Sequence, residues 1–214
     1  MDMEKVENQE EVWNSVAEQW SNFRQRPHKD IELRLKYLSE KWKPGRILDV
    51  GCGNCRNLLP FAFREFKCYG IDFSENMLEQ AEIFCGNHKM RVALKKSESS
   101  KLSFPDKSFD YVLCLNVIHC MEKDTRERTI KEIKRVLKPN GEALISVWNK
   151  LQKRFLFEKK ELMIPWTVKG KKFNRYYYLF TPKEIKSLFI KNGFKVIKCN
   201  TFGRNIILHA KKLG

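Results

Sequence analysis

An apolar strand that runs into a glycine turn is the feature of this chain that most restricts its fold. Residues 46–55 read RILDVGCGNC, and the next apolar segment, 67–72, ends in Asp72. Gly51 and Gly53 carry no Cβ, so the backbone can turn sharply there and approach a ligand closely. In an open α/β sheet, such a turn and such an acid meet at the carboxyl ends of the strands, where nucleoside-bearing cofactors bind. The sequence therefore predicts an α/β fold in which the Asp72 carboxylate accepts hydrogen bonds from a ribose.

The rest of the chain alternates between helical and extended patterns. Apolar spacing predicts helices over 8–22, 28–42, 55–65 and 123–137, and two more that begin after the caps Ser74 and Thr181. Apolar runs predict strands over 46–50, 67–71, 90–94, 109–115, 142–148, 194–199 and 205–211. We expect a doubly wound sheet, mostly parallel, that ends in an antiparallel hairpin. Residues 1–214 are predicted to form one domain, with N-terminal helices in 1–45 and a basic, aromatic, irregular insert over 150–180.

Composition narrows the functional classes. The chain is 42% hydrophobic, which predicts a folded globule, and it has no apolar run near the roughly 20 residues that a membrane span needs. The polar N-terminus does not look like a secretion signal, and seven cysteines without framework spacing indicate reduced thiols, so we expect a cytoplasmic protein. Lys and Arg number 42 against 26 Asp and Glu, and the net charge of +16 favours a polyanionic partner.

The glycine turn differs from the dinucleotide-binding fingerprint, because Asn54, Cys55 and Arg56 follow it and no pyrophosphate cradle is evident. The pattern D-x-G-x-G with a downstream acid resembles the S-adenosylmethionine site of class I methyltransferases, which have a seven-stranded Rossmann-like fold. The resemblance implies that the cofactor is bound by Asp49, Gly51, Cys52, Gly53, Asp72, Phe73, Glu98 and Asn116.

Alternatives remain for three of these features. Asp49 could hold the glycine loop without contacting the ligand, and Glu98 could be an ordinary loop acid. Cys52 and Cys55 form a C-x-x-C pair of the thioredoxin type, but that interpretation leaves the glycines and the acids unexplained. No second cysteine pair has metal-ligand spacing, so we predict no metal site.

Four further motifs point to a subfamily. V-I-H at 117–119, T-R-E-R at 125–128, P-W at 165–166 and R-Y-Y-Y-L at 175–179 occur in this order. Together they resemble the tRNA methyltransferases that esterify 5-carboxymethyluridine at the anticodon wobble position, including the methyltransferase domain of the animal AlkB-homologue fusion. Cys55, Cys120 and Met121 stand where that subfamily usually has glycine, histidine and tryptophan. The expected substrate is the anticodon loop of a tRNA.

The chemistry of such a substrate fits the residues present. A carboxylate, with a pKa near ~4, is already ionised at neutral pH and can attack a sulfonium methyl group without a general base. The resemblance implies catalytic roles for Arg24, which could pair with the carboxylate, and for His119, Arg175 and Tyr177. Predicted RNA contacts are Lys153, Arg154, Lys171, Lys172, Arg175 and Tyr176. Each role has an alternative. His119 could be hydrogen-bonded within the fold, the three tyrosines at 176–178 could form an aromatic strand edge, and the basic residues could form a solvated face.

The resemblance also implies a partner, because members of this subfamily commonly work with a small zinc-binding activator protein. We expect it to add a strand beside residues 90–94. Two other functions stay open: a methyltransferase of the same fold that acts on a small molecule, and a non-catalytic RNA-binding protein on a methyltransferase fold. The glycine turn and Asp72 are intact, which speaks against the second.

Overall fold

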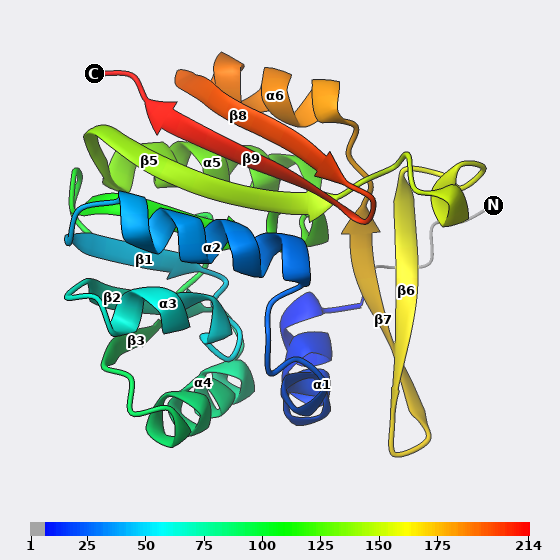
Figure 1. Cartoon of the computed structure of the whole chain (residues 1–214). Coiled ribbons are helices and arrows are strands. Elements are labelled where there is room, and N and C mark those ends of the chain that lie inside the picture. Colours follow the sequence, from blue (N-terminus) through cyan, green and yellow to red (C-terminus); the bar gives the residue numbers. More distant parts are fainter. Residues whose placement is uncertain (1–6) are drawn as a thin grey trace.

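Parallel strands rich in aliphatic residues form the centre of the computed structural model, which describes residues 7–214 (Figure 1). The seven strands of the main sheet have the order β3-β2-β1-β4-β5-β9-β8. Strands β1 to β5 run parallel, and β9 is antiparallel to both β5 and β8. This order confirms the predicted doubly wound sheet with an antiparallel C-terminal hairpin.

The elements follow the predicted sequence patterns closely. The strands of the main sheet are β1 Arg46–Val50, β2 Lys67–Asp72, β3 Val92–Lys96, β4 Phe109–Leu115, β5 Leu137–Trp148, β8 Phe194–Phe202 and β9 Asn205–Lys212. The helices are α1 Gln9–Phe23, α2 Lys29–Lys41, α3 Leu59–Ala62, α4 Glu75–Asn87, α5 Lys123–Val136 and α6 Pro182–Lys191. The predicted caps are also present: the Ser74 side chain accepts a hydrogen bond from the backbone of Met77, and Thr181 forms a capping box with Glu184.

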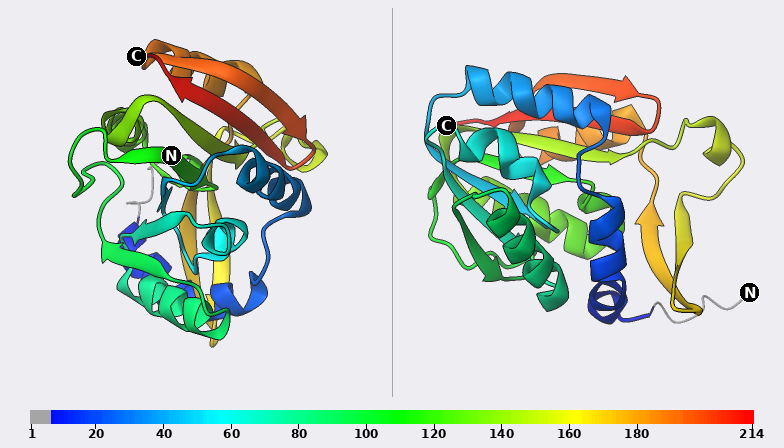
Figure 2. Two further views of the ribbon diagram at one scale, coloured as in Figure 1. Left: turned by 60° about the vertical axis from the view of Figure 1, so that its left-hand side comes forward. Right: turned by 60° about the horizontal axis from the view of Figure 1, so that its bottom comes forward.

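Helices cover both faces of the sheet (Figure 2). Helices α2, α3 and α4 contribute Leu35, Phe61 and Phe84 to one apolar cluster. Helices α5 and α6 contribute Ile133 and Phe189 to another, on the opposite face. Among residues 7–214, no helix has both the length and the apolar character required to cross a membrane.

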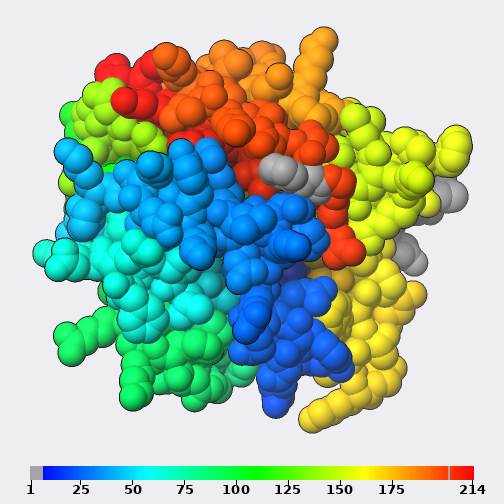
Figure 3. Space-filling view, in the orientation of Figure 1, coloured from blue at the N-terminus to red at the C-terminus, as the bar shows by residue number. Residues whose placement is uncertain are grey.

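The insert over 150–180 is not irregular, as we expected, but contains an antiparallel hairpin of β6 Glu161–Val168 and β7 Lys171–Tyr178. Every second side chain of β6, including Ile164 and Trp166, is partly buried, and the residues between are exposed. This is the two-residue period of a strand with one covered face. The hairpin lies beside α1 at the carboxyl ends of the parallel strands (Figure 1) and is at the right-hand edge of the molecule in this orientation (Figure 3).

Other elements also differ from the prediction: β5 begins five residues before the expected 142, and β8 ends three residues after the expected 199. The helix expected over 55–65 is a 3₁₀ turn, Arg56–Leu58, followed by the short α3, because Cys55 has a left-handed backbone with φ 64° and Glu65 has φ 59°. The strand expected over 90–94 is β3, two residues later, at one edge of the sheet.

Candidate active site

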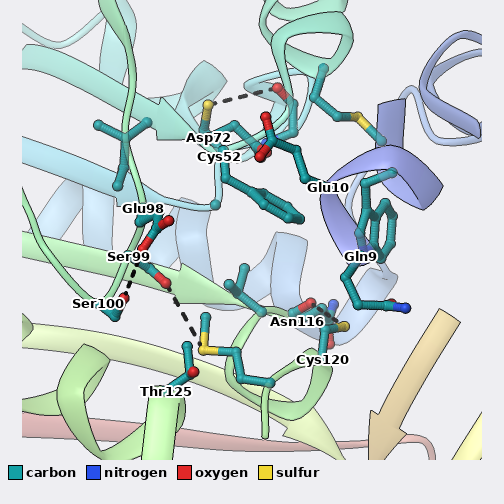
Figure 4. A pocket seen from close by; sticks show the side chains of 18 of the residues that line it. Gln9, Glu10, Cys52, Asp72, Glu98, Ser99, Ser100, Asn116, Cys120 and Thr125 are labelled. Carbon is teal, nitrogen blue, oxygen red and sulfur yellow. Dashed lines mark hydrogen bonds between the residues drawn. The ribbon is translucent and has the colours of Figure 1, made fainter. Parts of the chain in front are cut away.

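A cavity of about 420 Å³ lies at the carboxyl ends of β1, β2 and β4 (Figure 4). Its size is within the usual range for a small-molecule site. Most of the predicted cofactor residues line it, namely Gly51, Cys52, Gly53, Asp72, Phe73, Glu98 and Asn116. The structure therefore brings together side chains from four separate loops, as the carboxyl ends of parallel strands allow.

The glycine turn forms the floor of this cavity. Gly51 has φ +68°, and a Cβ built on it would lie 2.6 Å from Cγ2 of Val117, in the loop after β4. A Cβ on Gly53, with φ +53°, would lie 3.2 Å from the Trp20 ring of α1. The turn is thus packed too closely against its neighbours to accept a side chain at Gly51, and it leaves the cavity open above it.

Asp72 connects the glycine turn to the N-terminus of α4 through hydrogen bonds to its carboxylate. Its Oδ2 accepts a hydrogen bond from the Gly53 N–H at 3.0 Å, and its Oδ1 accepts one from the Ser74 N–H at 3.1 Å. Burial raises the pKa of Asp72 to about 6, although these backbone hydrogen bonds oppose the shift. The carboxylate is ionised at neutral pH and lines the cavity, where it can accept hydrogen bonds from the hydroxyl groups of a ribose.

Asp49 differs from the prediction, because it lies beneath the turn and is not among the residues that line the cavity. It is fully buried, and its Oδ2 accepts a hydrogen bond from Asn57 Nδ2 at 3.4 Å. Burial raises the pKa of Asp49 to about 8, with Asn57 and Arg56 opposing the shift. This placement matches the alternative in which Asp49 supports the loop and does not contact the ligand.

Glu98 and Asn116 lie on different sides of the cavity (Figure 4). The Glu98 carboxylate accepts a hydrogen bond from Ser100 Oγ at 3.3 Å. Asn116 has a left-handed backbone, φ 61°, and its N–H donates to Ser146. Its side-chain Oδ1 is buried and has no partner among residues 7–214, so it is available to a ligand.

Helix α1 forms a wall of the cavity that the sequence did not reveal. Gln9, Glu10, Trp13 and Trp20 all line the cavity. The helix is held to α4 by Asn14, whose Oδ1 accepts a hydrogen bond from the Ser74 hydroxyl at 2.7 Å. The helical spacing of the two tryptophans indicated a packed face, but the pattern cannot say whether that face meets a core or a cavity.

The hairpin is fastened to the other side of α1. The Gln9 side chain donates to the Asn174 carbonyl at 3.2 Å and accepts from the Tyr176 N–H at 3.0 Å. Trp166 Nε1 donates to Gln19 Oε1 at 2.5 Å. Helix α1 therefore joins the hairpin to the loop that carries Asp72, and Tyr176 of the hairpin lines the cavity.

The residues predicted to be catalytic lie outside the cavity lining. His119 is 1% exposed, its ring stacks on Trp148 and Tyr177, and its Nδ1 accepts a hydrogen bond from the Trp148 N–H at 3.3 Å. Burial, reinforced by Arg126 and Arg175, lowers the pKa of His119 to about 3. The imidazole is neutral at physiological pH, which matches the alternative of a histidine bonded within the fold.

Arg175 is a buried cation at the base of the hairpin. It is 6% exposed, and its Nη1 donates to the Tyr177 hydroxyl at 3.0 Å. Its guanidinium lies over the rings of Trp166, at 4.8 Å, and Trp13, at 5.6 Å. Its Nε has no hydrogen-bond partner, and it forms no ion pair with a carboxylate among residues 7–214. Arg24 is exposed, and its guanidinium lies 5.9 Å from the same Trp166 ring.

The predicted RNA-contact cations are on the surface, apart from Arg175. Lys153, Arg154, Lys171 and Lys172 are all exposed. Arg154 lies over the Phe155 ring at 4.2 Å, and the neighbouring Phe157 is fully exposed. Lys153, Arg154 and the exposed Phe157 ring thus lie in the segment that precedes the hairpin, and Lys171 and Lys172 lie on β7.

Comparisons with known proteins agree with the geometry. Residues 47–141 match a family described as "Methyltransferase domain". The chain is 31% identical over 168 residues to "Probable tRNA methyltransferase 9B" of Mus musculus, covering 78% of this chain and 36% of that protein. It is 32% identical over 164 residues to "Putative methyltransferase" of Encephalitozoon cuniculi, covering 72% of each. The chain thus spans about a third of the length of the mouse relative.

The fold is shared with a solved structure, the 1,6-didemethyltoxoflavin-N1-methyltransferase of Burkholderia thailandensis with bound S-adenosylhomocysteine. The TM-score is 0.73 at 17% identity, over 100% of this chain and 93% of that one. The residues present fit the cofactor, because the close-packed glycine turn, the Asp72 carboxylate and the unpaired Asn116 oxygen all face one cavity. The chain therefore belongs to the class I S-adenosylmethionine-dependent methyltransferases, and within them it is similar in sequence to the mouse tRNA methyltransferase 9B.

Proposed function

We propose that this methyltransferase acts in the cytoplasm on tRNA and esterifies the carboxymethyl group of 5-carboxymethyluridine at the wobble position, U34. The observation that carries the proposal is Arg175, a buried guanidinium without a carboxylate partner among residues 7–214. A buried charge without a counterion costs several kcal/mol. The carboxylate of an acceptor would relieve that cost, and the Trp13 ring, which lies 5.6 Å from the Arg175 guanidinium, lines the cavity.

The chemistry of the neighbouring groups supports a carboxylate acceptor over a hydroxyl acceptor. A hydroxyl must lose a proton, whereas a carboxylate is already ionised. Burial raises the pKa of Tyr177 far above neutrality, and the Nδ1 of the neutral His119 is occupied by a backbone N–H. Neither group is poised to remove a proton. When bound, S-adenosylmethionine supplies an electrophilic methyl group, and the task of the protein is to hold the acceptor in line with it.

The surface around the hairpin supports an RNA substrate. The exposed cations Lys153, Arg154, Lys171 and Lys172 can neutralise phosphates, and the exposed Phe157 ring can stack on a base. The net charge of +16 acts in the same direction at longer range. We infer that the anticodon loop lies along this surface.

The decisive experiment is transfer of tritiated methyl groups to bulk tRNA from cells that lack the enzyme, followed by mass spectrometry of the nucleosides. We expect a methyl ester of 5-carboxymethyluridine. Label in a ring carbon or a 2′-oxygen would refute the proposal, and label in small molecules alone would identify the other kind of methyltransferase. Arg175→Gln should reduce kcat/KM for tRNA by about 30-fold or more while cofactor affinity is unchanged, because only the acceptor loses its counterion.

RNA binding can be tested through its salt dependence. Lys171→Gln together with Lys172→Gln should lower the slope of log affinity against log salt by roughly 1.4, about 0.7 for each phosphate contact to a single strand. Lys195→Gln with Lys198→Gln is a matched control, because these exposed lysines are on β8, at the sheet edge opposite β3. Equal slopes in the two double variants would show that the hairpin is not part of the RNA-binding surface.

We also propose that the small zinc-binding activator adds a strand to β3, which is an edge strand with an unpaired side. Coexpression of the two proteins should give a stable heterodimer. Ala93→Pro, which removes a backbone N–H from β3, should weaken that heterodimer if Ala93 donates to the added strand. A chain that is monomeric and fully active on tRNA, and that forms no complex on coexpression, would overturn this part of the proposal.

A further inference from the structure

Arg56 is a second buried cation, and it belongs to the wall of the cofactor cavity. It directly follows the glycine turn, lines the cavity and is 9% exposed. Its guanidinium lies 4.6 Å from the ring of Trp20, which also lines the cavity. Its Nη1 donates to Asn54 Oδ1 at 3.1 Å, and Asn54 in turn donates to Ser21 Oγ and the Arg24 carbonyl, each at 3.1 Å. The side chain is therefore held in place between the glycine turn and α1.

The charge of Arg56 has no ionic partner among residues 7–214. Its Nε is buried without a hydrogen-bond partner, and no carboxylate among residues 7–214 forms an ion pair with it. Asp49 is the acid that acts on it from a distance, but burial raises the pKa of Asp49 to about 8, so that carboxyl is mostly neutral at pH 7. Arg24 adds a further positive charge nearby. A buried guanidinium without an ionic partner is costly, and an anionic group on a bound ligand would lower that cost.

The cofactor has one anionic group that could pair with Arg56. S-adenosylmethionine carries no phosphate, and its only anionic group is the α-carboxylate of the methionine moiety. Asp72, the last residue of β2, and Glu98, on the loop after β3, are acids and are suited to hydroxyl and amine donors, not to a carboxylate. We propose that Arg56 binds the methionine carboxylate of the cofactor and so positions that end of it beside the glycine turn. Planar guanidinium groups are well matched to carboxylates because they can donate two parallel hydrogen bonds.

The test compares two ligands that differ by this group alone: S-adenosylmethionine and decarboxylated S-adenosylmethionine. Dissociation constants are measured by calorimetry for the wild-type protein and for Arg56→Met. The wild type should bind the decarboxylated ligand about 10- to 100-fold more weakly, as expected for loss of a charge-assisted hydrogen bond. In Arg56→Met the two ligands should bind with nearly equal affinity, because the carboxylate has lost its partner.

Two further variants separate this role from a structural one. Arg128→Met removes an exposed guanidinium from another part of the cavity lining and should keep the wild-type ratio. Arg56→Lys keeps the charge and should restore part of the ratio. If Arg56→Met weakened both ligands equally, Arg56 would only support Trp20 and the turn, and the inference would be wrong.

The inference is also wrong if the ratio is unchanged and only the KM for tRNA rises, because Arg56 would then serve the acceptor. The binding measurements need no RNA, so they stand whatever substrate the enzyme is shown to methylate.

Discussion

Replacing Asp72 with asparagine removes one negative charge from the cavity and keeps the shape of the side chain. In the wild type, the two carboxylate oxygens accept hydrogen bonds from the Gly53 and Ser74 N–H groups at 3.0 and 3.1 Å. Asparagine has one acceptor oxygen, so one of these buried donors loses its partner. We expect the free energy of unfolding to fall by about 1–3 kcal/mol, the usual cost of an unsatisfied buried donor.

The same substitution should also weaken cofactor binding. Hydrogen bonds from ribose hydroxyls to a carboxylate are charge-assisted, and replacing them with neutral ones should cost about 2 kcal/mol, or roughly 30-fold in Kd. Because the pKa of Asp72 is raised to about 6, the carboxyl is ionised at pH 7.5 and mostly protonated at pH 5. Cofactor affinity of the wild type should therefore fall as the pH is lowered through 6.

The assay is calorimetric titration with S-adenosylhomocysteine at pH 7.5 and pH 5, with thermal unfolding at both values. Asp72→Asn should bind weakly at pH 7.5 and should lack the wild-type change on acidification. Asp124→Asn, at an exposed acid in the first turn of α5, is the control. If Asp72→Asn bound as tightly as the wild type at both pH values, the assignment of the ribose to Asp72 would be refuted.

Three other predictions concern the turn, a helix cap and a histidine. Gly51→Ala should lower the free energy of unfolding by about 2–4 kcal/mol in urea titrations, because its φ is +68° and the new Cβ would lie 2.6 Å from Val117. Gly86→Ala, with open space around its Cβ, should instead be stabilising, and similar losses in both variants would contradict the argument. Thr181→Ala should cost about 1 kcal/mol by removing the capping box of α6, and Thr181→Ser should recover most of it. With a pKa of about 3, His119 should contribute no inflection to kcat/KM between pH 5.5 and 8, and an inflection abolished by His119→Asn would show that the imidazole titrates.

The parts of the fold that follow local rules could be predicted from the sequence. The buried parallel strand β4 is a nearly continuous apolar run, interrupted by Asp110, and the glycine turn and Asp72 can be identified from residue types alone. The hairpin could not be predicted, because Met163 and Pro165, at exposed positions of β6, obscure its two-residue alternation. Its partly buried face, which includes Trp166, meets α1, a segment more than a hundred residues away along the chain.

The candidate site likewise contains residues whose positions could be predicted from the sequence and residues whose positions could not. Cofactor residues lie directly at strand ends, so their place in the chain predicts their place in space. His119 also follows a strand, yet it does not line the cavity, and its ring packs against Trp148 and Tyr177. That packing depends on the hairpin, and so does the burial of Arg175. Long-range packing of this kind leaves no signal in the local sequence.

The unpaired guanidinium of Arg175 bears on how a turnover ends. In the proposed reaction, one step converts the anionic acceptor into a neutral ester and the sulfonium of the cofactor into a neutral thioether. Arg175 attracts the substrate, but it faces an uncharged group as soon as the product forms. The product state then contains a buried cation without a counterion, which is unfavourable. The enzyme should therefore bind its product more weakly than its substrate, and the same residue that recruits the acid promotes departure of the ester.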